Sequence, residues 1–262
     1  MATFVFFHAH PDDESIGTGG MIAKASALGH RVVVVVATKG EHGTKAEGLL
    51  RPGEQLWQRR VAETIHAAQI LGVDRLEFLD YRDSGMMGDP ANDDPGSFWT
   101  ADVEVAAHSL AAVLRHEHAD VLAIYDETGI TGHPDHIQVH RVGVRAGELA
   151  GTAQVVEGTM SRSQAASLIR QAIGLGATDV SLDIDLDQFG TPDEIITDRI
   201  DVRAFLDLKR QAMAAHASQI SETSLFLNMD PVAFEEVWGH ECLIRRHSSD
   251  GDSSLDSLLA LV

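Results

Sequence analysis

The chain of 262 residues carries 20 Lys and Arg side chains against 40 Asp and Glu, a formal net charge of −20 at pH 7. This balance argues against a nucleic-acid partner and against an anionic membrane surface, because both are bound by clustered basic side chains. With 44% hydrophobic residues, the chain is long enough for one large α/β domain or at most two small ones.

The cysteine content points to a reducing compartment. Cys242 is the only cysteine, so no disulfide forms within the chain and no zinc site is built from thiolates. The longest strongly apolar run, 32–37, is too short to span a membrane, and the N-terminus lacks the basic region of a signal peptide. We therefore expect a cytoplasmic protein with no membrane partner.

Short runs rich in β-branched residues alternate with longer helical segments. The predicted strands are 3–8, 31–38, 76–79, 121–125, 154–158 and 180–184. The predicted helices are 18–28, 54–71, 101–116, 135–149, 161–173, 201–215 and 231–237. This alternation predicts an α/β protein with a Rossmann-like three-layer fold, in which helices cover both faces of a mostly parallel sheet.

The domain organisation is expected to be simple. Residues 1–247 are predicted to form a single domain, and 248–262 a flexible C-terminal tail. The apolar end of that tail, 258–262, could dock on the body or on a second subunit, so a homo-oligomer is possible. The segment 82–100 is long, polar and rich in Gly and Pro, which is typical of functional or mobile loops.

Two clusters of imidazole and carboxylate side chains follow two of the predicted strands. His10, Asp12 and Asp13 come after the first strand, and His133, Asp135 and His136 come after the strand at 121–125. Ligands of open parallel sheets bind beyond the carboxyl ends of the strands, so the two clusters are expected to meet there. One His-Pro-Asp sequence alone would be weak support for a metal site, but the second cluster at a second strand end makes the interpretation much stronger.

The residue types suggest a hydrolytic metal centre. Zinc in such centres takes three protein ligands and keeps one position open, and His10, Asp13 and His136 can supply them. Iron(II) also suits these ligands. Asp12 is the candidate general base for the water at the metal. His133 is expected to oppose it, as a cation that stabilises the oxyanion or as a general acid, with Asp135 hydrogen-bonded to it to keep it protonated.

Other interpretations of the same residues stay open. Glu14 fits a structural role in the turn, near the start of a helix, where acidic residues are favoured. Two His and one Asp also make the iron site of non-haem oxygenases, although those enzymes usually have an all-β scaffold. A relative that binds a sugar or a metal without turnover is a further alternative, which the filled catalytic positions make less attractive.

Several motifs together resemble the PIG-L/LmbE family of zinc-dependent N-deacetylases. They are Ala9 to Glu14, Gly19-Gly20, Thr38 to Glu41, Arg60 with Glu63, Leu71-Gly72-Val73, Gly132 to His136, Lys209 to Ala212, Ala215 to Gln219 and Trp238 to Glu241. The resemblance implies hydrolysis of an N-acetyl group, typically on an N-acetylglucosamine unit. It assigns the metal to His10, Asp13 and His136, the base to Asp12 and the oxyanion to His133.

Within the family, the chain resembles the actinobacterial branch that acts on mycothiol precursors and conjugates. This implies a small-molecule substrate, either an N-acetylated amino sugar or a larger amide such as a thiol–sugar S-conjugate. It also implies substrate contacts by Arg60, Asp83 and Met86, and we add Glu41 as a candidate. One departure is Thr131, since the deacetylases of this branch carry a tyrosine at that position.

Overall fold

The computed structural model describes residues 1–43, 48–174, 190–248, 255 and 259, which form an α/β fold around one seven-stranded sheet. The strand order is β3-β2-β1-β4-β5-β7-β6. The strands are β1 (Thr3–His8), β2 (Arg31–Thr38), β3 (Arg75–Tyr81), β4 (Val121–Tyr125), β5 (Gln154–Thr159), β6 (Asp198–Asp201) and β7 (His240–Ser248). β1 to β5 pair in parallel, whereas β7 pairs antiparallel with both β5 and β6.

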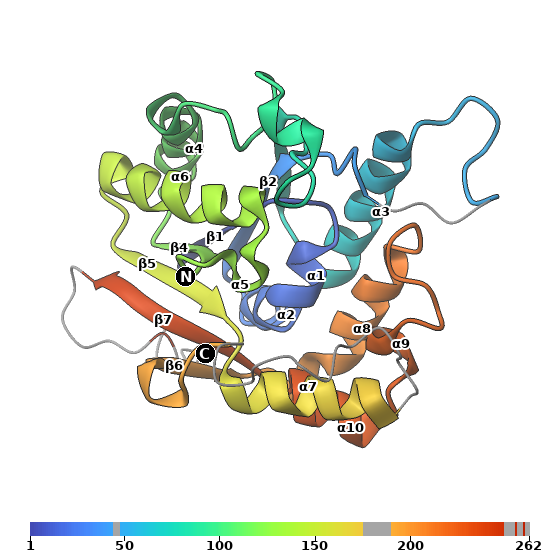
Figure 1. The fold of residues 1–262 in the computed structure, drawn as a ribbon. Coiled ribbons are helices and arrows are strands. Elements are labelled where there is room, and N and C mark those ends of the chain that lie inside the picture. The colour runs from blue at the N-terminus through green and yellow to red at the C-terminus, as the bar shows by residue number, and fades with distance from the viewer. Residues whose placement is uncertain (44–47, 175–189, 249–254, 256–258, 260–262) are drawn as a thin grey trace.

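Helices cover both faces of this sheet (Figure 1). They are α1 (Asp13–Gly17), α2 (Gly19–Ala27), α3 (Leu56–Leu71), α4 (Val103–Glu117), α5 (Gly129–Gly132), α6 (Pro134–Ala150), α7 (Arg162–Gly174), α8 (Leu206–Ala215), α9 (Leu225–Asn228) and α10 (Pro231–Trp238). Three short 3-10 turns, Pro90–Asp93, Asp193–Ile195 and Arg203–Phe205, lie in the connections. The predicted fold class is confirmed.

Alternation along β1 divides the core into two layers. Phe4 and Phe6 face a cluster that includes side chains of α2, α3 and α8, while Val5 and Phe7 face a cluster that includes side chains of α4 and α6. Both clusters are fully buried around β1 and β2, which explains why the run 32–36 is apolar without interruption.

The connections change direction at β1. The chain runs outward from β1 through β2 to β3 and then returns to place β4 on the other side of β1. Between β1 and β4 the connections therefore leave in opposite directions, and the loops beyond the carboxyl ends of these two strands border a crevice. The two clusters found in the sequence follow these two strands.

The predicted elements agree with the structure along most of the first 174 residues. The helix predicted at 18–28 corresponds to α2, whereas the short helix α1, which begins at Asp13, was not predicted. The predictions omitted α5, α9 and the antiparallel strands β6 and β7. The predicted strand at 180–184 lies outside the described residues.

Two residues of the predicted tail are part of the body. Leu255 is completely buried and Leu259 is 1% exposed, and both pack in the core layer that holds Phe4 and Phe6. The flexibility predicted for the rest of this tail stays a prediction.

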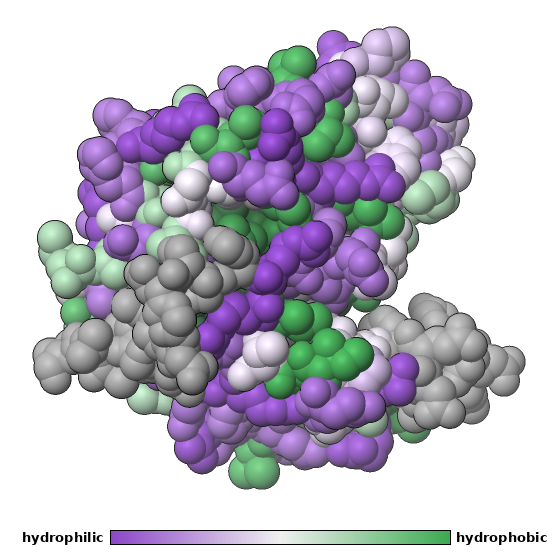
Figure 2. Space-filling model, turned by 90° about the vertical axis from the view of Figure 1, so that its left-hand side faces the viewer, coloured by the Kyte–Doolittle hydropathy of each residue, from purple (hydrophilic) through white to green (hydrophobic). Residues whose placement is uncertain are grey.

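Hydrophilic side chains cover most of the face seen in Figure 2, and hydrophobic side chains form small separate patches there. Among the described residues, no helix has both the length and the apolar character that a membrane crossing requires.

One buried carboxylate fastens three elements at the amino ends of the strands. The side chain of Glu117, 4% exposed at the end of α4, pairs with Arg31 of β2 at 2.5 Å and with Arg75 of β3 at 2.6 Å. Hydrogen bonds from these two guanidinium groups lower the pKa of Glu117 to about 2.

We predict that Glu117→Gln destabilises the protein at pH 7 by about 1–2 kcal/mol, a modest value because both arginines are partly exposed. The folded-state pKa is depressed, so this stabilisation is present above about pH 4.5 and is lost as the pH falls towards 2. Urea unfolding between pH 7 and pH 3 would test this, with the exposed Glu222→Gln as control. A difference between Glu117→Gln and the unsubstituted protein that does not shrink with falling pH would contradict it.

Candidate active site

The turn after β1 has an unusual backbone at Asp12. Its φ of 108° and ψ of −30° lie in a region that side-chain-bearing residues rarely adopt, at a cost of about 1–3 kcal/mol. Two buried charged side chains hold this turn. Arg60 donates to the carbonyl of Pro11, and the Glu14 carboxylate accepts the backbone N–H of Asp12 at 3.0 Å. The turn therefore directs Asp12 and Asp13 by means of partners fixed elsewhere in the fold.

Asp13 lies between the two histidines predicted to share a metal with it. Its Oδ2 is 3.3 Å from Nδ1 of His10 and 3.4 Å from Nε2 of His136. Ligand atoms at about 2.0–2.1 Å from a tetrahedral zinc ion are separated by roughly 3.3 Å, so both distances fit two edges of such a site. The donor set, two imidazoles and one carboxylate, also suits zinc or iron(II).

In both histidines, the ring nitrogen that does not face Asp13 also has a fixed partner. Nε2 of His10 lies 3.1 Å from Oδ2 of Asp135, and Nδ1 of His136 lies 3.1 Å from the carbonyl of Gly129. Such contacts orient metal-binding imidazoles and select the tautomer whose free nitrogen faces the ion. Gly129 has φ +66°, and a Cβ there would lie 2.6 Å from the Cβ of His136, so this contact requires glycine.

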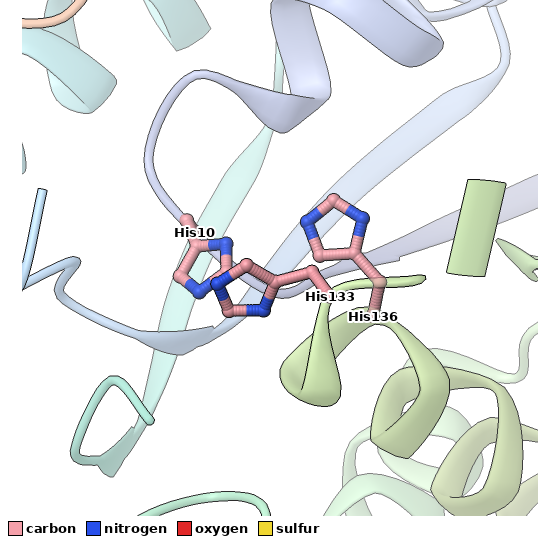
Figure 3. Close-up of side chains that lie close together, drawn as sticks. All are labelled: His10, His133 and His136. Atoms are coloured by element: carbon pink, nitrogen blue, oxygen red, sulfur yellow. The ribbon is translucent and has the colours of Figure 1, made fainter. Parts of the chain in front are cut away.

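His133 lies against the same group but is arranged differently from our expectation. Figure 3 shows its ring beside His10, and the ring centroids are 4.5 Å apart. Its Nδ1 accepts the backbone N–H of Asp135 at 3.1 Å, which leaves the ring proton on Nε2. Burial, together with His10 and His136, lowers the pKa of His133 to about 4. The predicted cation is therefore a neutral imidazole in this structure.

The role predicted for Asp135 is also corrected. Its carboxylate is completely buried and is engaged by His10 and by the backbone N–H and hydroxyl of Ser84. No hydrogen bond joins that carboxylate to His133 among the described residues. Asp135 thus orients His10 and connects it to the loop 82–100, whose Ser84 also accepts the backbone N–H of Trp99.

By spacing alone, two groups of described residues could hold a metal ion, and the predicted ligand Asp13 belongs to neither of them. One is His10, His133 and His136, and the other is His10, Asp83, His133 and Asp135. In the second group the carboxylate of Asp135 is already occupied by Ser84. His133 is therefore the serious competitor of Asp13 for the third ligand position.

Asp12, the candidate general base, is largely buried beside a guanidinium group. Its side chain is 17% exposed and lies 3.4 Å from the guanidinium of Arg60. Burial raises the pKa of Asp12 to about 6, and Arg60 opposes this shift. A carboxyl group with a pKa near neutrality can accept a proton and release it again at physiological pH.

The residues predicted to contact the substrate differ in their exposure and in their hydrogen-bond partners. Arg60 is 4% exposed and donates to the carbonyls of Gly40 and Pro11, so its charge supports the turn. Asp83 lies 3.6 Å from His10 and accepts the N–H of His42, while Glu41 accepts the N–H of Asp83. Met86 is exposed. These contacts show a connected polar wall on the His10 side.

Sequence reasoning missed the charged pairs behind the turn. His216 and Glu14 are both fully buried and lie 2.6 Å apart, and Lys209 pairs with Glu241 at the same distance. Glu241 also accepts the N–H groups of Gly20 and Met21 at the start of α2. All four residues belong to motifs noted in the sequence, but only the fold reveals which residues are partners.

Comparison with known proteins now connects this geometry with a family. Residues 5–147, more than half of the chain, match the family described as PIG-L: GlcNAc-PI de-N-acetylase. The chain belongs to the PIG-L family. This confirms the family predicted from the motifs.

Two curated relatives of this PIG-L protein are named 1D-myo-inositol 2-acetamido-2-deoxy-alpha-D-glucopyranoside deacetylase. The protein of Acidothermus cellulolyticus is 40% identical over 256 residues, which cover 92% of this chain and 88% of the relative. The protein of Nocardiopsis dassonvillei is 42% identical over 235 residues, 82% and 83% of the two chains. The predicted enzyme class, an N-deacetylase, is confirmed by these relatives.

Solved PIG-L-like structures share the fold at low identity. The N,N'-diacetylchitobiose deacetylase of Pyrococcus horikoshii has a TM-score of 0.62 at 20% identity, over 93% of this chain and 83% of that one. The 4-carboxy-2-hydroxymuconate hydratase GalB of Pseudomonas putida has a TM-score of 0.61 at 18% identity, over 94% and 96%. The second protein is a hydratase, so the fold by itself does not determine the reaction.

We predict that His136→Ala abolishes stoichiometric binding of zinc, because it removes a ligand that Gly129 holds in place. The exposed His108→Ala should leave binding intact and serves as the matched control. Metal content after dialysis, measured by plasma emission spectroscopy, would decide. Full zinc content in His136→Ala would contradict the assigned site.

We further predict that Asp135→Asn lowers zinc affinity by about 10- to 100-fold, because the orienting carboxylate of His10 is lost while the side-chain volume is kept. Competition with a chromogenic chelator would measure this change. An unchanged affinity in a folded variant would show that Asp135 does not act through His10.

Proposed function

We propose that the protein removes the N-acetyl group from an N-acetylglucosamine unit linked to a small polyol such as inositol, and releases acetate and the free amine. The observation that carries this proposal is the placement of Asp12 and Asp13 beside His10 and His136, at the point where β1 and β4 end. The names of relatives that match over 82–92% of the chain support the choice of substrate. A cytoplasmic location remains part of the proposal.

We infer that His10, Asp13 and His136 hold a divalent ion, zinc or iron(II). Such an ion, when bound, would polarise the amide carbonyl and make a nearby water easier to deprotonate. A carboxylate among the ligands offsets part of the charge of the ion, and for this reason we favour Asp13 over His133 as the third ligand. The parallel sheet differs from the all-β scaffold expected of an oxygenase with similar ligands.

Asp12 moves the proton in this scheme. The attacking water loses a proton as its oxygen adds to the carbonyl carbon, and the Asp12 carboxylate accepts that proton. When the C–N bond breaks, the same carboxyl group can return the proton to the leaving amine. The pKa of about 6 suits both steps, because the carboxylate form that accepts the proton prevails at neutral pH and the acid form that returns it is only about tenfold less populated.

His133 stabilises the carbonyl oxygen as it gains negative charge. Its Nε2–H is the free donor of a neutral ring, whose orientation is fixed by the N–H of Asp135. Thr131 is exposed in α5, and its short side chain cannot extend as far as the tyrosine expected at this position. We therefore assign the oxyanion contact to His133 alone, and the polar contacts of the sugar to Asp83 and Glu41.

We predict that Asp12→Asn lowers kcat by about 10²- to 10⁴-fold while zinc content stays unchanged, since the amide is isosteric but accepts no proton. Acetate release from N-acetylglucosaminyl-inositol would be measured enzymatically, with the exposed Asp207→Asn as the matched control. Undiminished turnover in Asp12→Asn would refute the assigned base. If the zinc-loaded, unsubstituted protein releases no acetate from this compound, the proposed substrate is wrong.

A further inference from the structure

An apolar cavity opens beside Asp13 and His136, and the polar-wall residues Asp83 and Glu41 are not among the residues that line it. It measures about 250 Å³, and Asp13, His136 and Thr131 are among its lining residues. Most of its wall is apolar, and its apolar lining residues include Ile16, Met160, Leu168, Phe226, Val237 and Trp238. These side chains belong to α1, α7, α9, α10 and the segment after β5. Apart from α1, all of these elements follow the two imidazole–carboxylate clusters in the chain.

Several polar groups in this wall already have partners within the protein, whereas the buried indole N–H of Trp238 has no hydrogen-bond acceptor among the described residues. Cys242 Sγ lies 3.0 Å from Gln164 Oε1, and Gln164 Nε2 donates to the carbonyl of His240 at 2.6 Å. The Glu241 carboxylate accepts two backbone N–H groups of α2 and pairs with Lys209. Little hydrogen-bonding capacity is therefore left for a polar ligand, and the cavity favours hydrocarbon.

The two sides of the metal-binding group thus differ in chemistry. His10 borders the polar wall through Asp83 and Asp135, whereas His136 and Asp13 border the apolar cavity. An amide whose carbonyl lies at these ligands extends one arm to each side. The hydroxyl-rich amino sugar matches the polar wall, so the acyl chain is left for the cavity.

We propose that this cavity is an acyl-binding subsite, and that the protein hydrolyses N-acyl amino sugars with short linear apolar acyl chains, such as butanoyl, more efficiently than N-acetyl ones. The inference rests on the proposed amide hydrolysis and specifies its substrate class. A methyl group fills about the volume of one water molecule, ~30 Å³, so acetyl alone leaves most of the 250 Å³ empty. The reaction stays balanced for any chain: water adds to the carbonyl carbon, the C–N bond breaks, the nitrogen takes the proton, and a carboxylate and an amine leave.

The first test compares kcat/KM of the zinc-loaded protein on glucosamine carrying acetyl, propanoyl, butanoyl and hexanoyl groups. Burial of each added methylene should raise kcat/KM roughly threefold, so butanoyl should exceed acetyl about tenfold. A parallel series of N-acetylglucosaminides with alkyl aglycones of the same lengths tests the other arm. A gain with aglycone length and a loss with acyl length would place the aglycone in the cavity and overturn the inference.

The second test narrows the cavity. Leu168→Trp should lower the butanoyl-to-acetyl ratio of kcat/KM at least tenfold, whereas Ile173→Trp, which adds a tryptophan at an exposed position of the same helix α7, should preserve it. The ratio does not depend on the fraction of folded enzyme, so partial misfolding does not obscure the result. An unchanged ratio in Leu168→Trp would overturn the inference.

Calorimetric titration separates this inference from the proposed function. Butanoate should bind the zinc-loaded protein about tenfold more tightly than acetate, and Leu168→Trp should remove that difference. Cleavage of the acetyl compound with equal binding of both carboxylates leaves the proposed function intact and overturns the subsite. Absence of cleavage for every amide overturns the proposed function, and the titration still decides whether the subsite exists.

Discussion

The hydrogen bond between His10 and Asp135 is the contact on which the site depends. It joins residues 125 positions apart in the chain, at the ends of β1 and β4, where the sheet connections diverge. Because Asp135 is also fixed by Ser84, one buried carboxylate connects the first strand, the fourth strand and the loop after β3. A fold that brought β1 and β4 together in another register would separate the two imidazole–carboxylate clusters. The sheet topology is thus the physical origin of the metal-binding group.

The strained turn at Asp12 is stabilised by a layer of buried charges behind it. Glu14 accepts the N–H of Asp12 and pairs with His216, and Arg60 donates to the carbonyl of Pro11. A φ of 108° for an aspartate costs about 1–3 kcal/mol, which charge-assisted hydrogen bonds of about 1.5–3 kcal/mol each can offset. These partners come from α1, α3 and the segment after α8, so three distant parts of the chain hold this one turn.

Sequence patterns predicted the parallel half of the fold well, since β1, β2 and β4 are short, fully apolar runs that end at marked turns. They did not predict β6 and β7 at the antiparallel edge of the sheet, because the short apolar stretches of these strands, Ile200 and 242–244, are flanked by charged residues. The residues of the site could be named from the two motifs, but their partners could not. Asp135 faces His10 instead of His133 because β4 lies next to β1, and that depends on the topology of the whole chain. The apolar cavity was missed for the same reason, because its walls come from helices that are distant in sequence.

The central claim of this account is that Asp13, between His10 and His136, completes the metal site, and that His133 stays free to donate to the substrate. A crystal structure of the zinc-loaded protein, with anomalous data at the zinc edge, tests this most directly. The account predicts one ion bound by His10 Nδ1, an Asp13 oxygen and His136 Nε2, with His133 outside the coordination sphere. An ion bound by His133 in place of Asp13 would contradict it, because the donor assigned to the oxyanion would then be a ligand.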